Sequence, residues 1–275
     1  MDANLLRSAD PIHVARPPTR RGASPAVRWR HSLPILALVL FVTGWEALVR
    51  VGNYPAFLLP TPERVARKLL SVIADGTLIR HTGVTLVEVL GGLALGLIVA
   101  TVLGYALAKS VALERAIAPY LVASQAVPII AIAPLLVIWF GPGLWSKILI
   151  SALIVFFPIL INTIAGVRSV PTDLRDLMRS LHATRWQTFA KLEVPAALPV
   201  LLAGLKVGAT LSVIGAVVGE FAGSDAGLGF MISVADGQYD TARMFVGVLA
   251  LVVLALSLYG SVALIERRAL AWRSS

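Results

Sequence analysis

Cysteine is absent from the 275 residues, which excludes a disulfide framework and a thiolate metal site. Histidine is scarce and scattered, without the H-x-x-x-H spacing of a metal-binding helix; the four residues are His13, His31, His81 and His182. The sequence also lacks a G-x-x-x-x-G-K-[ST] phosphate loop and a G-x-S-x-G nucleophile turn. These absences predict a chain with no catalytic residues, no metal and no cofactor of its own.

Charged side chains are few as well, at 14% of the chain, whereas soluble domains carry about 25%. Hydrophobic residues make up 57%, the mean hydropathy is +0.84, and the apolar residues are gathered into long runs. A helix that crosses a hydrocarbon core of about 30 Å needs roughly 20 such residues. The chain is therefore predicted to be an integral membrane protein. Its net charge of +9 then reflects basic residues that flank spans and set topology, rather than nucleic-acid binding.

Six apolar runs predict an all-α, polytopic membrane protein with six transmembrane helices. Only a short glycine-rich segment separates the third run from the fourth, so these two spans should form a tight hairpin. Pro128 and Pro134 are expected to bend the third span. The expected spans are residues 33–49, 84–108, 117–140, 144–167, 196–222 and 245–265.

Basic residues are distributed unevenly between the loops. Residues 1–32 contain six arginines and four prolines and indicate a disordered basic tail, followed by a transmembrane domain over residues 33–275. With the N-terminus inside, the inner segments hold 16 Lys and Arg residues and the outer segments hold seven. The positive-inside rule then places both termini in the cytoplasm. In the first outer segment, Thr61, Pro62 and Glu63 predict the start of an amphipathic surface helix.

The loop between spans four and five, about residues 168–194, has an amphipathic pattern. Thr172 is placed to cap a first helix. The apolar positions of that helix are spaced i, i+3, i+4 and i+7 and are Leu174, Leu177, Met178 and Leu181. Thr184 and Gln187 form the T-x-x-Q capping box of a second helix. We therefore predict a pair of short amphipathic helices, which either pack on their own membrane domain or dock into a groove on a partner protein.

The same loop resembles the EAA loop of permease subunits in binding-protein-dependent ABC importers. The pattern of that family is E-A-A, three residues, G, and then about nine residues to I-x-L-P. The acid, the two alanines, the glycine and the closing pair are matched here by Asp176, Leu177, Met178, His182, Leu198 and Pro199. His182 thus replaces a glycine, and it either adopts a left-handed backbone or continues the helix.

The resemblance reaches from about residue 59 to residue 272 and is to permeases of the nitrate/sulfonate/taurine type. Similar segments are LPTP at 59–62, PLLVIWFG at 134–141, FPILINT at 157–163, GEF at 219–221 and GLG at 227–229. The resemblance implies a type I ABC importer permease fold, with cytoplasmic coupling helices between spans four and five, in a bacterial inner membrane. The residues that match the motif would form the coupling contact, while Leu181 would pack the loop on its own membrane domain.

Partners and solute also follow from the resemblance. It implies a second permease copy, two ATP-binding cassette subunits that hydrolyse the ATP, and a periplasmic substrate-binding protein. The solute would be small, such as a sulfonate, taurine, nitrate or a vitamin precursor. The alternative is a carrier driven by an ion gradient, which would not need a cytoplasmic helix pair.

Small and polar residues inside the predicted spans are further candidates for helix packing and for the translocation pathway. Four glycines share one face of span five in two G-x-x-x-G pairs, which predicts close helix contact; they are Gly204, Gly208, Gly215 and Gly219. Charges inside spans are costly and often functional, so the translocation-pathway candidates are Lys206, Glu220 and Glu88, with Gln125 and Asn162 beside them. The two acids lie near the outer ends of their spans, where they could instead reach water. Lys206 lies deeper, and it either faces the pathway, where it would favour an anion, pairs with an acid elsewhere, or snorkels.

Overall fold

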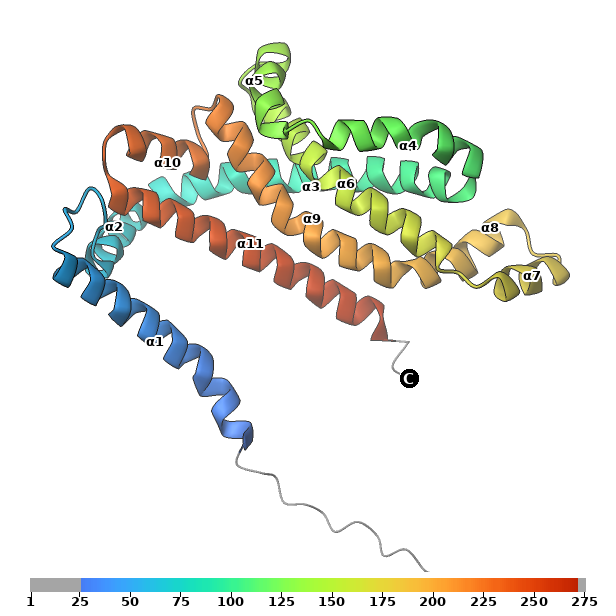
Figure 1. Cartoon of the computed structure of the whole chain (residues 1–275), viewed down its shortest axis with the longest axis horizontal. Coiled ribbons are helices and arrows are strands. Elements are labelled where there is room, and N and C mark those ends of the chain that lie inside the picture. Colours follow the sequence, from blue (N-terminus) through green and yellow to red (C-terminus); the bar gives the residue numbers. More distant parts are fainter. Residues whose placement is uncertain (1–25, 272–275) are drawn as a thin grey trace, which may run out of the picture. The chain divides into compact units, whose positions relative to one another are not determined.

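The computed structural model describes residues 26–271, with side chains from residue 36 onward (Figure 1). The chain forms two compact units, one ending at Val51 and one beginning at Gly52. The first contains nearly all of α1 (Ala26–Gly52), a helix of 27 residues that includes the predicted first span. The predicted disordered tail lies outside the described residues as far as residue 25. Helix α1 begins at Ala26, within the last part of the predicted tail.

The second unit is helical throughout, and the described residues contain no strand, as the all-α prediction requires. Two helices, α7 and α8, lie at the end where α6 finishes, while α2 and α10 lie at the opposite end, where α3 begins (Figure 1). The elements are α2 (Pro62–Ala74), α3 (Thr77–Lys109), α4 (Val111–Gln125), α5 (Ile129–Phe140), α6 (Leu144–Arg168), α7 (Thr172–Ser180), α8 (Arg185–Thr188), η1 (Phe189–Glu193), α9 (Val194–Ala222), α10 (Leu228–Gly237) and α11 (Thr241–Ala269).

Four helical stretches of this unit are long and apolar enough to cross a membrane, namely α3, α6, α11 and the 38-residue stretch Arg185–Ala222. They coincide with predicted spans two, four, six and five. The predicted surface helix is also present as α2, where Thr61 accepts a hydrogen bond from the Arg64 amide at 3.3 Å and Pro62 opens the helix. Val65 and Val72 form its buried face.

The third predicted span is broken rather than gently bent. Its halves, α4 and α5, pass the membrane test only together and meet at an angle of 94°. Pro128 stands at the break as the N-cap of α5 and has no amide hydrogen to continue the ladder of α4. The preceding amides of Ala126 and Val127 bond three residues back instead, to Ala123 and Ser124. Pro134 lies inside α5 without ending it.

The core of the unit lies between α3, α6 and α9, and the four glycines of α9 take part in its contact with α6. A Cβ added at Gly215 would lie 2.5 Å from the Ser151 Cα, and one at Gly219 would lie 3.1 Å from the Lys147 Cα. Gly204 and Gly208 similarly lie against Asn162 and Ile159 of α6. The predicted glycine face therefore brings two helices of the same chain together.

The predicted second loop helix is not separate from span five. From Arg185 the chain runs through α8 and the π turn η1 into α9 without a break. The π turn lies directly before Pro195, and the Val194 amide bonds back to the Phe189 carbonyl, five residues earlier. This wider turn accommodates a proline that lacks an amide hydrogen and crowds the preceding turn. Leu198 and Pro199 are consequently half-buried members of α9, not loop residues.

Candidate functional site

Helix α7 begins one residue earlier than the sequence suggested. Thr172 is its first helical residue rather than its cap, and Pro171 occupies the N-cap position without a side-chain hydrogen bond. The predicted cap is therefore wrong, because the Thr172 hydroxyl instead meets the Asp173 carboxylate at 3.4 Å. Pro171 has an extended backbone, with φ of −58° and ψ of 141°, immediately before the first helical residue.

Helix α7 ends in a Schellman motif in which His182 is the left-handed residue, with φ of +51°. The His182 amide donates to the Arg179 carbonyl and the Ala183 amide donates to the Met178 carbonyl, both at 2.9 Å. These two bonds define the motif. Of the two sequence-based alternatives, His182 therefore adopts the left-handed backbone that the family's glycine would favour, and it does not continue the helix.

Helix α8 begins with the predicted capping box. The Gln187 amide donates to the Thr184 hydroxyl at 3.2 Å, and the Thr184 amide donates to the Gln187 side chain at 2.8 Å. The left-handed His182 and this cap together fix a tight reversal between the two helices. The reversal projects α7 from the end of the bundle, as Figure 1 shows.

The apolar stripe of α7 is largely uncovered. Leu177 is 53% exposed and Leu181 is 67% exposed, whereas Met178 is partly buried. The expectation that Leu181 packs on its own membrane domain is therefore wrong, because the Schellman reversal turns that position outward. Beside the stripe, the Asp176 carboxylate and the Arg179 guanidinium form an exposed ion pair at 3.0 Å.

The base of the loop is tied to the bundle by a polar cluster that the sequence did not indicate. Glu193 of η1 is buried and accepts hydrogen bonds from the Tyr105 hydroxyl, at 2.9 Å, and from the Lys109 ammonium of α3. Arg175 of α7 donates to the Val167 carbonyl of α6 at 2.7 Å. The loop is thus held at its base and free along its outer face.

A second polar cluster lies at the opposite end of the bundle. Glu88 of α3 is 1% exposed and its carboxylate lies 3.7 Å from the ammonium of Lys147 on α6, which is equally buried. Lys147 also donates to the Pro142 carbonyl at 2.9 Å. Glu220 of α9 is buried beside them and accepts from the Thr85 hydroxyl at 2.6 Å.

This cluster also holds the start of α10. The first amides of a helix have no partner within the helix, and here side chains accept them. His81 Nδ1 accepts from Gly227 at 2.9 Å, the Thr85 hydroxyl accepts from Leu228 at 2.8 Å, and the Glu220 carboxylate accepts from the next two amides. The geometry pins α10 to α3 and α9 and gives Glu220 a structural role.

These positions overturn the alternative that the two acids reach water at the membrane surface, because both are buried within the protein. Lys147 is also buried inside the bundle, although the sequence-based charge count placed it in an outer loop. An acid inside a span requires a partner, and Lys147 lies three residues into α6, close enough to supply it. Helix α10 was missed as well, although Leu228, Met231, Ile232 and Ala235 carry its buried face at helical spacing.

The remaining pathway candidates do not gather in one place. The Lys206 ammonium pairs with the Glu266 carboxylate of α11 at 2.7 Å, which is the second of its three sequence-based alternatives. Gln125 is exposed at the end of α4. The Asn162 side chain donates to the Pro158 carbonyl of its own helix at 2.8 Å. Among residues 36–271, no three His, Asp or Glu side chains come close enough to hold a metal ion.

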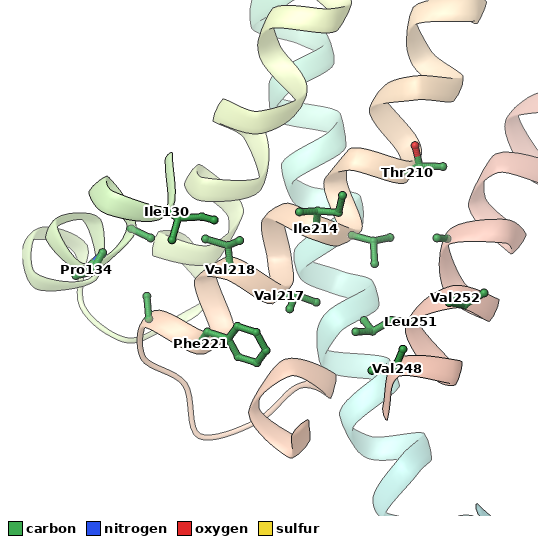
Figure 2. A pocket seen from close by; sticks show the side chains of 14 residues that line it. Ile130, Pro134, Thr210, Ile214, Val217, Val218, Phe221, Val248, Leu251 and Val252 are labelled. Carbon is green, nitrogen blue, oxygen red and sulfur yellow. The ribbon is translucent and has the colours of Figure 1, made fainter. Parts of the chain in front are cut away.

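An apolar groove of about 720 Å³ lies between α5, α9 and α11. Figure 2 shows Phe221, Val217 and Ile214 of α9 facing the groove opposite Leu251 and Val252 of α11. Thr210 contributes the one hydroxyl group among the lining residues, and none of these residues is charged. The groove therefore offers hydrocarbon contact but no partner for an ion.

Residues 92–270 match the family described as the inner membrane component of binding-protein-dependent transport systems. A riboflavin transport system permease protein from Chloroflexus aurantiacus is 45% identical over 88% of this chain and 90% of its own length. A formylaminopyrimidine transport permease protein from Halalkalibacterium halodurans is 34% identical over 87% and 95%. A putative aliphatic sulfonates transport permease protein from Bacillus subtilis is 32% identical over 90% and 89%.

A solved structure of the MetNI methionine ABC transporter, in an inward-facing conformation, contains a chain with the same fold. The TM-score is 0.63 at 21% sequence identity, and the match covers 71% of this chain and 97% of that one. At this identity the likeness shows the architecture alone. The 29% of the chain outside the match leaves room for elements that the other chain lacks.

Proposed function

The chain belongs to the family of inner membrane components of binding-protein-dependent transport systems, and we propose from this premise that α7 and α8 couple it to an ATPase subunit. Membership makes it a multi-pass transmembrane subunit of an ABC importer for a small solute and not itself an ATPase. It also replaces the alternative of a carrier driven by an ion gradient. The ATPase, the periplasmic binding protein and the cytoplasmic placement of α7 are parts of the proposal.

The observation that carries the proposal is the uncovered apolar stripe of α7. A nine-residue helix is too short to be stable alone in water, and this one gains little from burial because Leu174, Leu177 and Leu181 are exposed. A short helix with apolar side chains outside and an ion pair beside them is suited to a groove on a partner. The caps and the Glu193 cluster keep it ordered until the partner arrives.

The test combines Asp176→Lys, Leu177→Ala and Met178→Ala in one variant. We expect ATPase subunits to be lost from the purified complex, or ATP hydrolysis to stop responding to loaded binding protein in reconstituted vesicles. The variant should still insert in the membrane, because all three positions lie outside the long apolar helices. Arg267→Lys and Arg268→Lys on the exposed end of α11 serve as controls. Wild-type ATPase association and stimulation in the triple variant would refute the coupling role.

We also propose that a second copy of the chain covers the groove between α5, α9 and α11, so that the pathway forms between two permeases. The support is a large concave face with no charged residue, too wide for the unit to fill by itself. Phe221→Lys would place an ammonium in that contact. Cross-linking of two copies in the membrane should then fall, whereas Tyr120→Lys, on an exposed position outside the groove, should leave it unchanged.

For the solute, we propose an uncharged heterocycle of the vitamin or vitamin-precursor class rather than a sulfonate, taurine or nitrate. The argument for an anion rested on Lys206, and its charge is taken up by Glu266. The relatives named for riboflavin and formylaminopyrimidine are 45% and 34% identical, against 32% and 29% for those named for aliphatic sulfonates and taurine. Calorimetric titration of the partner binding protein with both solute classes tests the proposal, and tight binding of a sulfonate alone would refute it.

A further inference from the structure

A basic cavity of about 770 Å³ lies between the coupling loop, which is the segment 168–194 that contains α7 and α8, and the end of α3. Its lining includes four basic side chains and one acid, together with the Tyr105 hydroxyl and Thr188. The basic residues come from three different elements and are Lys109, Arg175, Arg179 and Arg185. A concave site with this excess of positive charge attracts an anion.

Two of the four cations have no anionic partner among the described residues. Lys109 pairs with Glu193, and Arg179 pairs with Asp176. Arg175 uses one of its nitrogens on the Val167 carbonyl, but its Nε is buried without any acceptor. Arg185 takes part in no ion pair of residues 36–271. A buried donor without an acceptor is costly, and the cavity therefore favours an anion that could pair with both guanidinium groups.

An apolar groove of about 600 Å³ adjoins the cavity and shares Tyr105, Arg185 and Glu193 with it. Away from these shared residues the groove is lined by α3, α6 and α9, mainly through apolar side chains such as Val102, Ala197 and Leu201. Trp186 and Phe189 also line the groove, with ring centroids 5.4 Å apart, and Trp186 is 72% exposed. Tryptophan is enriched at the depth of lipid headgroups.

We propose that the cavity and the groove together bind one anionic phospholipid, with its phosphate in the cavity and an acyl chain in the groove. A basic recess continuous with a hydrocarbon-lined channel matches both ends of such a molecule. A free phosphate would leave the groove empty, and a zwitterionic lipid would bring an ammonium group toward Arg175 and Arg185. The inference rests on the proposed function in placing this end of the bundle at the inner leaflet.

The proposed lipid would also connect the two helices of the coupling loop. The Arg175 guanidinium belongs to α7 and Arg185 opens α8, so a phosphate between them would bridge the two helices across the reversal at His182. The loop would then be held by the lipid as well as by the contacts of Glu193. The order of the loop would therefore depend on a bound lipid as well as on the amino-acid chain.

The test uses the purified full-length permease without ATPase subunits, titrated with phosphatidylglycerol or phosphatidylethanolamine and observed by native mass spectrometry. We expect one tightly retained phosphatidylglycerol and no equivalent phosphatidylethanolamine. The variant Arg175→Gln with Arg185→Gln should weaken retention about 25-fold, from roughly fivefold per cation near a membrane surface. Arg267→Gln with Arg268→Gln removes the same charge from exposed positions outside the cavity and should retain the lipid.

Two further arms distinguish the possible sources of the phosphate. Val102→Trp narrows the groove from an exposed position, and we expect it to weaken retention, whereas Ile98→Trp, one turn away and outside the groove, should not. Glycerol phosphate should compete poorly because it has no acyl chain. The proposal is overturned if glycerol phosphate competes as well as the lipid, if both lipids bind equally, or if Arg185→Gln alone, at an exposed position, changes nothing. Since no ATPase is present, this failure is distinguishable from failure of the coupling role.

Discussion

The two ends of the second unit differ in how far the chain satisfies its own groups. Where α3 begins, the amides of Gly227 and of the first three residues of α10 are accepted by side chains of α3 and α9, and the Lys147 charge is matched by Glu88. Where α6 ends, the leucine side chains of the apolar stripe of α7 are exposed, and the buried Nε of Arg175 has no acceptor. The first end pairs most of its polar groups within the chain, with Glu88 Oε2 and Arg243 Nε left over, whereas the second leaves apolar and basic side chains uncovered.

The largest expected contrast is in accessibility from the two sides of the membrane. Because the chain has no cysteine, single cysteines can be placed at Gln238 and Ser180, both exposed and at opposite ends. In intact cells that express the permease alone, an impermeant thiol reagent should label position 238 and leave position 180 unlabelled. Permeabilised cells should label both. The reverse pattern in intact cells would invert the proposed orientation.

The next contrast concerns buried and exposed ion pairs. Lys147→Met leaves Glu88 buried without its cation, which should lower the free energy of unfolding by about 3–5 kcal/mol. Lys68→Met breaks the pair with Asp240, whose side chains are partly in solvent, and should cost about 1 kcal/mol or less. Unfolding in a denaturing detergent measures both. Adding Glu88→Leu to Lys147→Met should recover most of the loss, and no recovery would mean that Lys147 acts through another contact.

A smaller effect is expected from filling the contact between α6 and α9. Gly215→Leu should destabilise the unit by about 1–3 kcal/mol, since the side chain would meet the Ser151 backbone. Gly260→Leu on α11 is the matched control, because nothing lies within 4 Å of a Cβ there. Thermal unfolding in detergent compares the two variants. Equal stabilities would contradict the close contact.

The smallest effect belongs to the coupling loop itself. His182→Gly removes the strain of a non-glycine residue at φ of +51° and should stabilise the loop by roughly 1 kcal/mol. Slower amide exchange at Ala183 would report it, since that amide closes the Schellman motif. His182→Ala should show the opposite trend. Equal exchange in all three proteins would mean that the backbone at this position carries no strain.

Elements with strong local signals were predictable from the sequence. The long apolar helices, the α2 start at Thr61 and the Thr184 capping box depend on hydropathy or on residues within one turn. The break at Pro128 was underestimated, because proline identifies a weak point but neighbouring packing sets the angle. The continuity from α8 into α9 was missed because Pro195 suggests the end of a helix. The π turn η1 allows the helix to continue through it.

The candidate site was predictable in place but not in detail. The sequence located the loop and the residues of its motif, yet it assigned Leu181 to the wrong side, since a reversal by a left-handed residue cannot be read from an apolar stripe. Glu193 and Lys147 were passed over because their partners lie 84 and 59 positions away in the chain. Pairings at such separations come from packing, and no short pattern encodes them.

The unbroken stretch from Arg185 to Ala222 behaves mechanically as a lever. Its 38 residues measure about 57 Å at a rise of roughly 1.5 Å each. The π turn near the driven tip is its most compliant joint, while the glycine contacts along α6 act as the fulcrum. Since these contacts lie nearer Ala222 than Arg185, a stroke applied at Arg185 would emerge beside Glu220 reduced in size and opposite in direction.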